Sequence, residues 1–239
     1  MARGLQVRAT TTAVRVPIGD QWLPGDLGLP SLPQGVVLFA HGSGSSRHSP
    51  RNQFVAGTLE QRGLATLLID LLTPDEEAID VRTAEFRFNL DMLTDRLGAI
   101  IGWLGRREVT SDLPIGLFGA STGGGAALMA AAARPHDVAA VVSRGGRPDL
   151  AGASLGQVRA PTLLIVGADD EPVIQMNRDA MKQMRGVVKL EIVPGATHLF
   201  EEPGTLEQVA ALAGDWFGRY LKPATSLKTG QKPPARAGD

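Results

Sequence analysis

The chain has 239 residues, with 24 basic and 25 acidic side chains and a formal net charge of −1 at pH 7. This balance gives no reason to expect a nucleic acid or a membrane surface as a partner, and no apolar run approaches the roughly 18 residues that a membrane span needs. The absence of cysteine excludes disulfides, thiolate metal sites and a cysteine nucleophile, and it favours a cytoplasmic protein.

The chain begins with two segments that read as short strands, TTAVRVPIG (11–19) and QWLPGDLGLP (21–30). Gly19 and Asp20 lie between them, and both residue types favour a tight turn. The sequence therefore predicts an antiparallel pair of strands at the N-terminal side of the fold.

Short apolar runs rich in Val, Ile, Leu and Ala recur through the rest of the chain. Such nearly continuous runs are typical of strands that are covered by helices on both faces. They occupy residues 35–42, 65–72, 113–121, 138–146, 161–170 and 188–198.

Helical patterns separate these runs. Residues 80–106 carry one apolar stripe at a spacing of three or four, which predicts a long amphipathic helix. Residues 50–62 begin with Pro50 at the first position and Ser49 as the cap. Further helices are expected over 123–133, 172–184 and 204–221.

Alternating strands and helices predict an α/β fold with one mostly parallel sheet, an antiparallel N-terminal start and helices on both faces. We expect a single domain over residues 1–221. Residues 222–239 are rich in Pro, Gly and basic residues and have no apolar face, so they read as a disordered tail without a function of its own.

The segment GLFGASTGGGAAL (116–128) places Ser121 between a predicted strand and a predicted helix. The pattern G-x-S-x-G in that context is typical of a nucleophile elbow, in which a strained turn lifts the serine hydroxyl above the sheet. Gly119 and Gly123 then provide the room that the turn needs. The alternative is a serine that caps a helix in a glycine-rich turn, and the pentapeptide alone does not exclude it.

A serine nucleophile needs a base and an acid that orients the base. His198 follows the strand 188–194, and Asp169 and Asp170 follow the strand 161–167, so all three lie at the same sheet edge as Ser121. We expect Asp170 to be the acid and Asp169 to cap the next helix, with Asp149 as an outside candidate.

These motifs resemble the α/β-hydrolase superfamily, specifically its dienelactone-hydrolase-like branch, over about residues 10–222. The resemblance rests on HGSGSSRHSPRN (41–52), GASTGG (119–124), GADDEPV (167–173) and GATHLF (195–200). In such proteins the acid commonly falls three residues after a strand-end glycine and three before a valine, which implies Asp170. Dienelactone hydrolase itself has a cysteine nucleophile where this chain has Ser121, so the resemblance does not carry its substrate over.

An oxyanion that forms at the attacked carbonyl needs two N–H donors. Thr122, directly after the nucleophile, is expected to supply one, and Ser43 in the loop after the strand 36–40 the other, with Gly44 as the near alternative. Residues 42–47 lack the pattern of a phosphate-binding loop. Metal-ligand spacings are also missing, so we expect neither a metal nor a cofactor.

The sequence thus predicts a serine hydrolase that cleaves a small ester or a related acyl bond, with Ser121, Asp170 and His198 as the triad. Only about 15 residues separate the strand that ends near 146 from the one that begins at 161, which leaves no room for a large lid. Amide hydrolysis, acyl transfer and a binding module without turnover remain alternatives.

The two loops expected beside Ser121 carry an excess of cations, among them Arg47 and Arg144. Arginine matches the geometry of carboxylates and phosphates. We therefore expect the substrate to carry a negative charge near these residues, unless they pair with Asp149 or Glu171 or face solvent.

Overall fold

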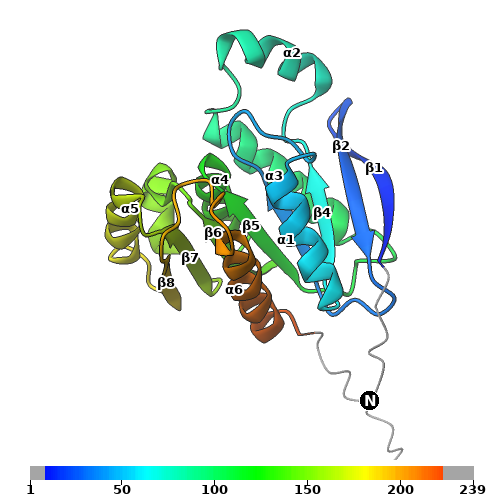
Figure 1. Cartoon of the computed structure of the whole chain (residues 1–239). Coiled ribbons are helices and arrows are strands. Elements are labelled where there is room, and N and C mark those ends of the chain that lie inside the picture. The colour runs from blue at the N-terminus through cyan, green and yellow to red at the C-terminus, as the bar shows by residue number, and fades with distance from the viewer. Residues whose placement is uncertain (1–8, 223–239) are drawn as a thin grey trace, which may run out of the picture.

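The structure is a computed structural model that describes residues 9–222 (Figure 1). Eight strands form one sheet in the order β1-β2-β4-β3-β5-β6-β7-β8. The strands are β1 (Thr10–Ile18), β2 (Gln21–Leu29), β3 (Val36–Ala40), β4 (Ala65–Ile69), β5 (Ile115–Ala120), β6 (Val138–Arg144), β7 (Thr162–Gly167) and β8 (Val188–Val193). The predicted tail lies outside the described residues, except for Lys222.

The first two strands form the antiparallel pair that the sequence predicts, with Gly19 and Asp20 in the turn between them. Strand β2 also runs antiparallel to β4. Strands β3 to β8 pair with one another in parallel. The predicted fold class, an α/β-hydrolase fold with an antiparallel start, is therefore confirmed.

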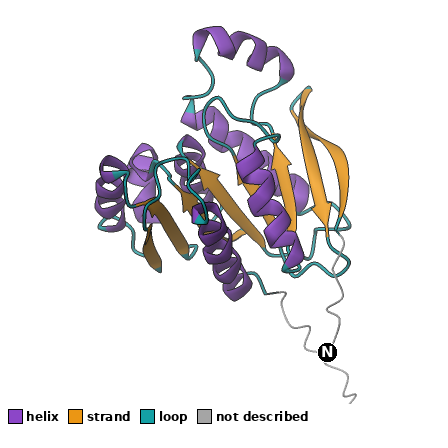
Figure 2. Ribbon diagram, in the orientation of Figure 1, coloured by secondary structure: helices purple, strands orange, loops and turns teal. Residues whose placement is uncertain are grey.

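Helices cover both faces of the sheet (Figure 2). They are α1 (Pro50–Gln61), α2 (Pro74–Thr83), α3 (Leu90–Leu104), α4 (Thr122–Ala133), α5 (Glu171–Met181) and α6 (Thr205–Tyr220). One buried cluster joins the sheet to α1 and α6, and another joins it to α3 and α4. Every residue of β3, β4, β5 and β7 is buried, which explains the continuous apolar runs of the sequence.

The prediction of a single helix over residues 80–106 is wrong, because two separate helices, α2 and α3, occupy this region. Helix α2 begins at a capping box of Thr73 and Glu76 and ends at Ala84, which is left-handed with φ 55°. The buried carboxylate of Asp80 then accepts hydrogen bonds from the backbone N–H groups of Phe86 and Arg87. A second helix, α3, starts after the cap Asn89. Helix α2 stands above α3 at the top of the molecule (Figure 1).

The connection from β6 to β7 forms a 3₁₀ segment, η1 (Pro148–Gln157), with a kink at Gly152. It packs beside α4 and α5 and does not form a lid. Among residues 9–222, no helix combines the length and the apolar character that crossing a membrane would require.

Candidate active site

Ser121 lies between β5 and α4 with φ 49° and ψ −122°, a backbone conformation that residues with a side chain rarely adopt. A Cβ atom on Gly119 would lie 2.6 Å from the carbonyl oxygen of Gly123, and one on Gly123 would overlap the carbonyl oxygen of Ala40. Ser121 therefore has the geometry of a nucleophile elbow, and the two glycines are the residues that allow it.

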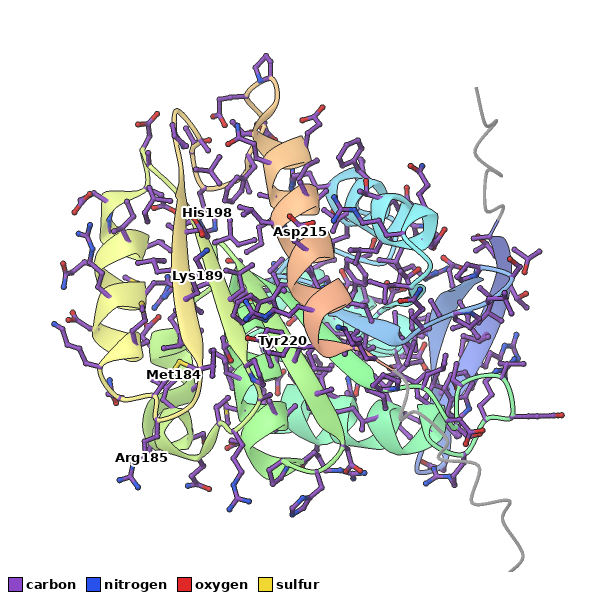
Figure 3. All side chains as sticks on the ribbon, turned by 90° about the horizontal axis from the view of Figure 1, so that it is seen from below. Met184, Arg185, Lys189, His198, Asp215 and Tyr220 are labelled. Carbon is purple, nitrogen blue, oxygen red and sulfur yellow. The ribbon has the colours of Figure 1, made fainter. Side chains whose placement is uncertain are left out.

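His198 lies in the loop between β8 and α6. Figure 3 shows it at one end of the strands, with Met184 and Arg185 at the other end. The backbone N–H of Asp169 donates to the carbonyl of Ala196 at 3.0 Å, which ties this loop to the end of β7. Within the loop, Glu202 accepts hydrogen bonds from the backbone N–H and the hydroxyl of Thr197. The base candidate thus sits in a loop that is held at both ends.

The fold brings the three candidate triad residues together. His198 Nδ1 lies 2.6 Å from Asp170 Oδ2, and His198 Nε2 lies 3.4 Å from Ser121 Oγ. The His198 side chain is 38% exposed and that of Asp170 is 14% exposed. A carboxylate, an imidazole and a hydroxyl in this order can transfer a proton from the hydroxyl to the imidazole while the carboxylate fixes the imidazole tautomer.

The other two aspartates lie outside this chain of hydrogen bonds. Asp149 accepts hydrogen bonds from Nε and Nη2 of Arg147, at 2.8 and 2.7 Å. Asp169 is exposed and is not the cap of α5, so that interpretation is wrong. The N-cap position belongs to Asp170, whose side chain makes no capping hydrogen bond because its carboxylate turns towards His198.

The expected oxyanion donors are in direct contact with each other. The backbone N–H of Ser43 donates to the hydroxyl oxygen of Thr122 at 2.8 Å. This bond ties the loop after β3 to the first residue of α4. The alternative donor, Gly44, is left-handed with φ +68°, and its Cα faces the guanidinium of Arg87.

His41 supports this loop through two hydrogen bonds. Its Nε2 accepts a hydrogen bond from the Leu71 N–H at 3.0 Å, so its proton lies on Nδ1, which donates to the Gly42 carbonyl at 2.9 Å. Burial lowers the pKa of His41, against the opposing effects of this backbone bond and of nearby carboxylates. His41 is therefore a neutral structural residue, as its place directly after a strand suggests.

Asn177 on α5 is a further supporting residue that sequence reasoning missed. It is fully buried, and its side-chain NH₂ donates to the carbonyls of Gly146 at 3.1 Å and Val173 at 2.8 Å. A Cβ atom on the neighbouring Gly145 would lie 3.5 Å from two His198 ring atoms. Asn177 thus fixes the loop against which the imidazole packs, and a lone Asn in an amphipathic helix gives no sequence signal of that role.

The two arginines expected near the substrate differ in their surroundings. Arg47 forms ion pairs with Asp70 and Asp26, and its backbone N–H also donates to Asp70. Arg144 is 7% exposed, and its Nη1 atom is buried with no hydrogen-bond partner among residues 9–222. Only Arg144 is thus left without compensation for its charge.

A cavity of about 570 Å³ lies beside residues 45–47 of the loop after β3. Trp22, Arg47 and Asp70 are among its lining residues, and none of the three triad candidates is. In the described part of the chain, no group of three or more His, Asp or Glu side chains could hold a metal ion.

Comparisons with known proteins identify the family of the chain. The model of the dienelactone hydrolase family matches residues 32–221. A solved dienelactone hydrolase from Anabaena variabilis is 57% identical, with a TM-score of 0.89 over 90% of this chain and 100% of that one. Est1E from Butyrivibrio proteoclasticus is 18% identical, with a TM-score of 0.72 over 87% of this chain and 98% of its own.

Two longer proteins from strains of Mycobacterium tuberculosis are 57% identical over 208 residues and bear the provisional name phosphoribosyl transferase. The match covers 87% of this chain but 46% of each relative. The chain therefore spans about half the length of these relatives.

Proposed function

Since the chain belongs to the dienelactone hydrolase family, we propose that it is a serine hydrolase that cleaves a small carboxylic ester through an acyl-enzyme on Ser121. The observation that carries the proposal is the chain of hydrogen-bonding side chains from Asp170 through His198 to Ser121. Membership of the family supports a hydrolase, and we propose the specific chemistry from the residues of this chain.

In the proposed mechanism, Ser121 Oγ attacks the ester carbonyl carbon while His198 Nε2 takes the hydroxyl proton. The tetrahedral intermediate collapses when the protonated imidazole gives this proton to the leaving alcohol. Water then attacks the acyl-enzyme, again with His198 as the base, and Ser121 is regenerated. Asp170 keeps the proton of the neutral imidazole on Nδ1, so that Nε2 stays free to accept.

We propose that the backbone N–H of Thr122 and that of Ser43 or Gly44 stabilise the oxyanion. Thr122 begins α4, so the partial positive charge of the helix N-terminus adds to the stabilisation. The Ser43 N–H is engaged by the Thr122 hydroxyl before substrate binds. An oxyanion would have to share or replace that hydroxyl as the acceptor, whereas Gly44 could donate without this exchange.

The site is open, because more than a third of the His198 side chain is exposed and η1 stands where larger enzymes of this fold carry a lid. An open site admits water to the acyl-enzyme, which favours hydrolysis over acyl transfer to a second substrate. Amide hydrolysis uses the same groups and is the closest alternative. We also propose a small-molecule substrate and a cytoplasmic location.

The name of the longer M. tuberculosis relatives bears on the substrate. A phosphoribosyl group is a phosphorylated sugar, so the name favours a phosphorylated molecule as the substrate of this chain. We therefore include acyl esters of phosphorylated alcohols among the candidate substrates.

A fluorophosphonate label and a series of p-nitrophenyl esters of increasing chain length test the proposal. We expect a single labelled serine, Ser121, and loss of labelling and esterase activity in Ser121→Ala at an unchanged fold. Ser45→Ala is the matched control and should keep both. A labelled peptide that contains Ser43 or Ser45, or an unlabelled protein, would show that the elbow is not a nucleophile.

A further inference from the structure

Arg144 is a buried cation without a counter-charge. It ends β6, is 7% exposed, and its Nη1 has no hydrogen-bond partner among residues 9–222. The neighbouring arginines do have partners: Arg51 pairs with Glu201 at 2.9 Å and Arg147 with Asp149 at 2.7 Å. Because a buried charge that is neither paired nor hydrogen-bonded is costly, an unpaired guanidinium beside a candidate active site points to a ligand that supplies the missing charge.

The side chain of Arg144 lies on the sheet face that α1 and α6 cover, where burial, with help from the positive charge of Arg51 in the first turn of α1, lowers the pKa of Arg144. Side chains alternate along a strand, so Arg144 shares a sheet face with Val142, two residues earlier. Val142 and Ile165, the residue of β7 that pairs with Arg144, belong to the buried cluster that includes Val55 of α1. The Arg51–Glu201 ion pair holds the first turn of α1 against the loop that follows His198.

Two further buried polar atoms without partners lie on that first turn. Neither Arg51 Nε nor Asn52 Oδ1 has a hydrogen-bond partner in the part of the chain that the structure describes. The Asn52 amide can present either its oxygen or its NH₂ to a ligand. Three unpartnered polar groups therefore lie on the end of β6 and the start of α1, at the sheet edge that carries Ser121.

This region adjoins the proposed reaction centre. The backbone N–H of Ser121 donates to the carbonyl oxygen of Arg144 at 3.2 Å, and the next residue, Gly145, packs beside the His198 ring. A group held by Arg144 would thus belong to a molecule within reach of Ser121.

The charges indicate which anion fits. Arg144 and Arg51 contribute two positive charges, the N-terminus of the twelve-residue helix α1 adds about half a charge, and Glu201 removes one. The sum is about +1.5, and a phosphate monoester carries about −1.5 to −2 at pH 7. A carboxylate would leave part of the positive charge uncompensated, and because Glu201 is 62% exposed its contribution is screened by solvent.

We propose that Arg144, Arg51 and the first turn of α1 form a subsite for a phosphate group, and that the ester cleaved at Ser121 is an ester of a phosphorylated small molecule. The identity of the ester rests on the proposed function, whereas the phosphate subsite does not. Burial, together with the charge of Arg51, lowers the pKa of Arg144 to about 10, so its guanidinium is still charged at neutral pH and ready to bind an anion.

Binding is tested without turnover in the Ser121→Ala variant. Inorganic phosphate should raise its melting temperature in a saturable way, and addition of Arg144→Met should abolish the rise. Arg147→Met is the matched control. It also removes one positive charge, three residues after Arg144, but Asp149 already neutralises Arg147 in the wild-type protein. Sulfate and acetate serve as the divalent and monovalent comparison anions.

The kinetic arm compares 2-acetoxyethyl phosphate with the neutral monoacetate of ethylene glycol and with 3-acetoxypropionate. We expect KM for the phosphate ester to be at least tenfold below that of the neutral ester, with the carboxylate ester between them. Arg144→Met should raise the ratio of KM for the phosphate ester to KM for the neutral ester about tenfold, and Arg147→Met should not change it. If Arg144→Met does not fold, Arg51→Met takes its place with the same expectation.

Equal KM values for the phosphate and neutral esters in the wild-type protein would overturn the proposal. So would a phosphate-induced rise in melting temperature that survives Arg144→Met, or a preference for the carboxylate ester. If phosphate binds through Arg144 but none of the esters is cleaved, the subsite stands and the proposed ester hydrolysis fails.

Discussion

Replacing Asp170 by Asn tests the triad with the smallest change in shape. In the wild-type protein, Asp170 Oδ2 accepts a hydrogen bond from His198 Nδ1–H, with 2.6 Å between the two atoms. An asparagine can turn its NH₂ towards Nδ1 instead, which shifts the imidazole proton to Nε2. His198 Nε2 would then donate towards Ser121 Oγ rather than accept from it, and the hydroxyl would lose its base.

The expected loss is large in kcat and small in stability. Loss of the orienting carboxylate in a comparable triad costs about 10⁴ in kcat, and at about 1.4 kcal/mol for each factor of ten this corresponds to roughly 5.5 kcal/mol of transition-state stabilisation. We expect 10³ to 10⁴ here. Because the Asp170 side chain makes no capping bond to α5 and Asn is an equally good cap, the free energy of unfolding should change by less than about 0.5 kcal/mol.

The assay is hydrolysis of p-nitrophenyl acetate at saturating substrate, alongside urea denaturation of each variant. Asp169→Asn is the matched control: it is adjacent and exposed, so it should change kcat by less than twofold. An equal loss in both variants, or a greater loss in Asp169→Asn, would mean that Asp170 is not the orienting acid. A collapse in stability would mean that the carboxylate acts on the fold rather than on the imidazole.

Three further results are expected. Ser121→Gly should be more stable than Ser121→Ala by about 1 kcal/mol in urea denaturation, because only glycine adopts the positive φ of this residue without strain; equal stabilities would argue against strain. Thr122→Val removes the hydroxyl that accepts the Ser43 N–H and should lower kcat about tenfold if this bond positions the oxyanion donors, whereas an unchanged kcat would show that it does not. Desolvation raises the pKa of Asp80, but hydrogen bonds from Arg87 and Phe86 outweigh it, so the folded-state pKa lies below its ordinary value. The ionised carboxylate therefore stabilises the fold above about pH 4. Asp80→Asn should lower the free energy of unfolding by about 1–3 kcal/mol at pH 7, and this loss should shrink as the pH falls through the lower folded-state pKa.

The sequence by itself determined the architecture, because that information is local. Continuous apolar runs such as 36–40 and 161–167 mark strands that are buried on both faces, and the helical patterns between them require parallel connections. Parallel strands present their carboxyl ends at one edge, so the placement of Ser121 and His198 after predicted strands already predicted that they would meet.

The tertiary structure decided what depends on distant partners. The apolar stripe of 80–106 continues across the break between α2 and α3, and only the buried Asp80 carboxylate and its backbone donors show where the helix stops. The sequence favoured Asp170 over its neighbour Asp169 as the acid, but only the placement of the His198 loop brings the Asp170 carboxylate to 2.6 Å from His198 Nδ1 and puts Asp170, not Asp169, at the N-cap of α5.

The two arginines give the clearest case. Arg47 and Arg144 look equivalent in the sequence, as single cations on loops at the same edge of the sheet. Arg47 meets Asp26 from β2 and Asp70 from the end of β4, whereas Arg144 ends in the interior beside a second cation, Arg51. Whether a charge is compensated depends on side chains brought within a few ångströms by the fold, and sequence spacing carries no information about that distance.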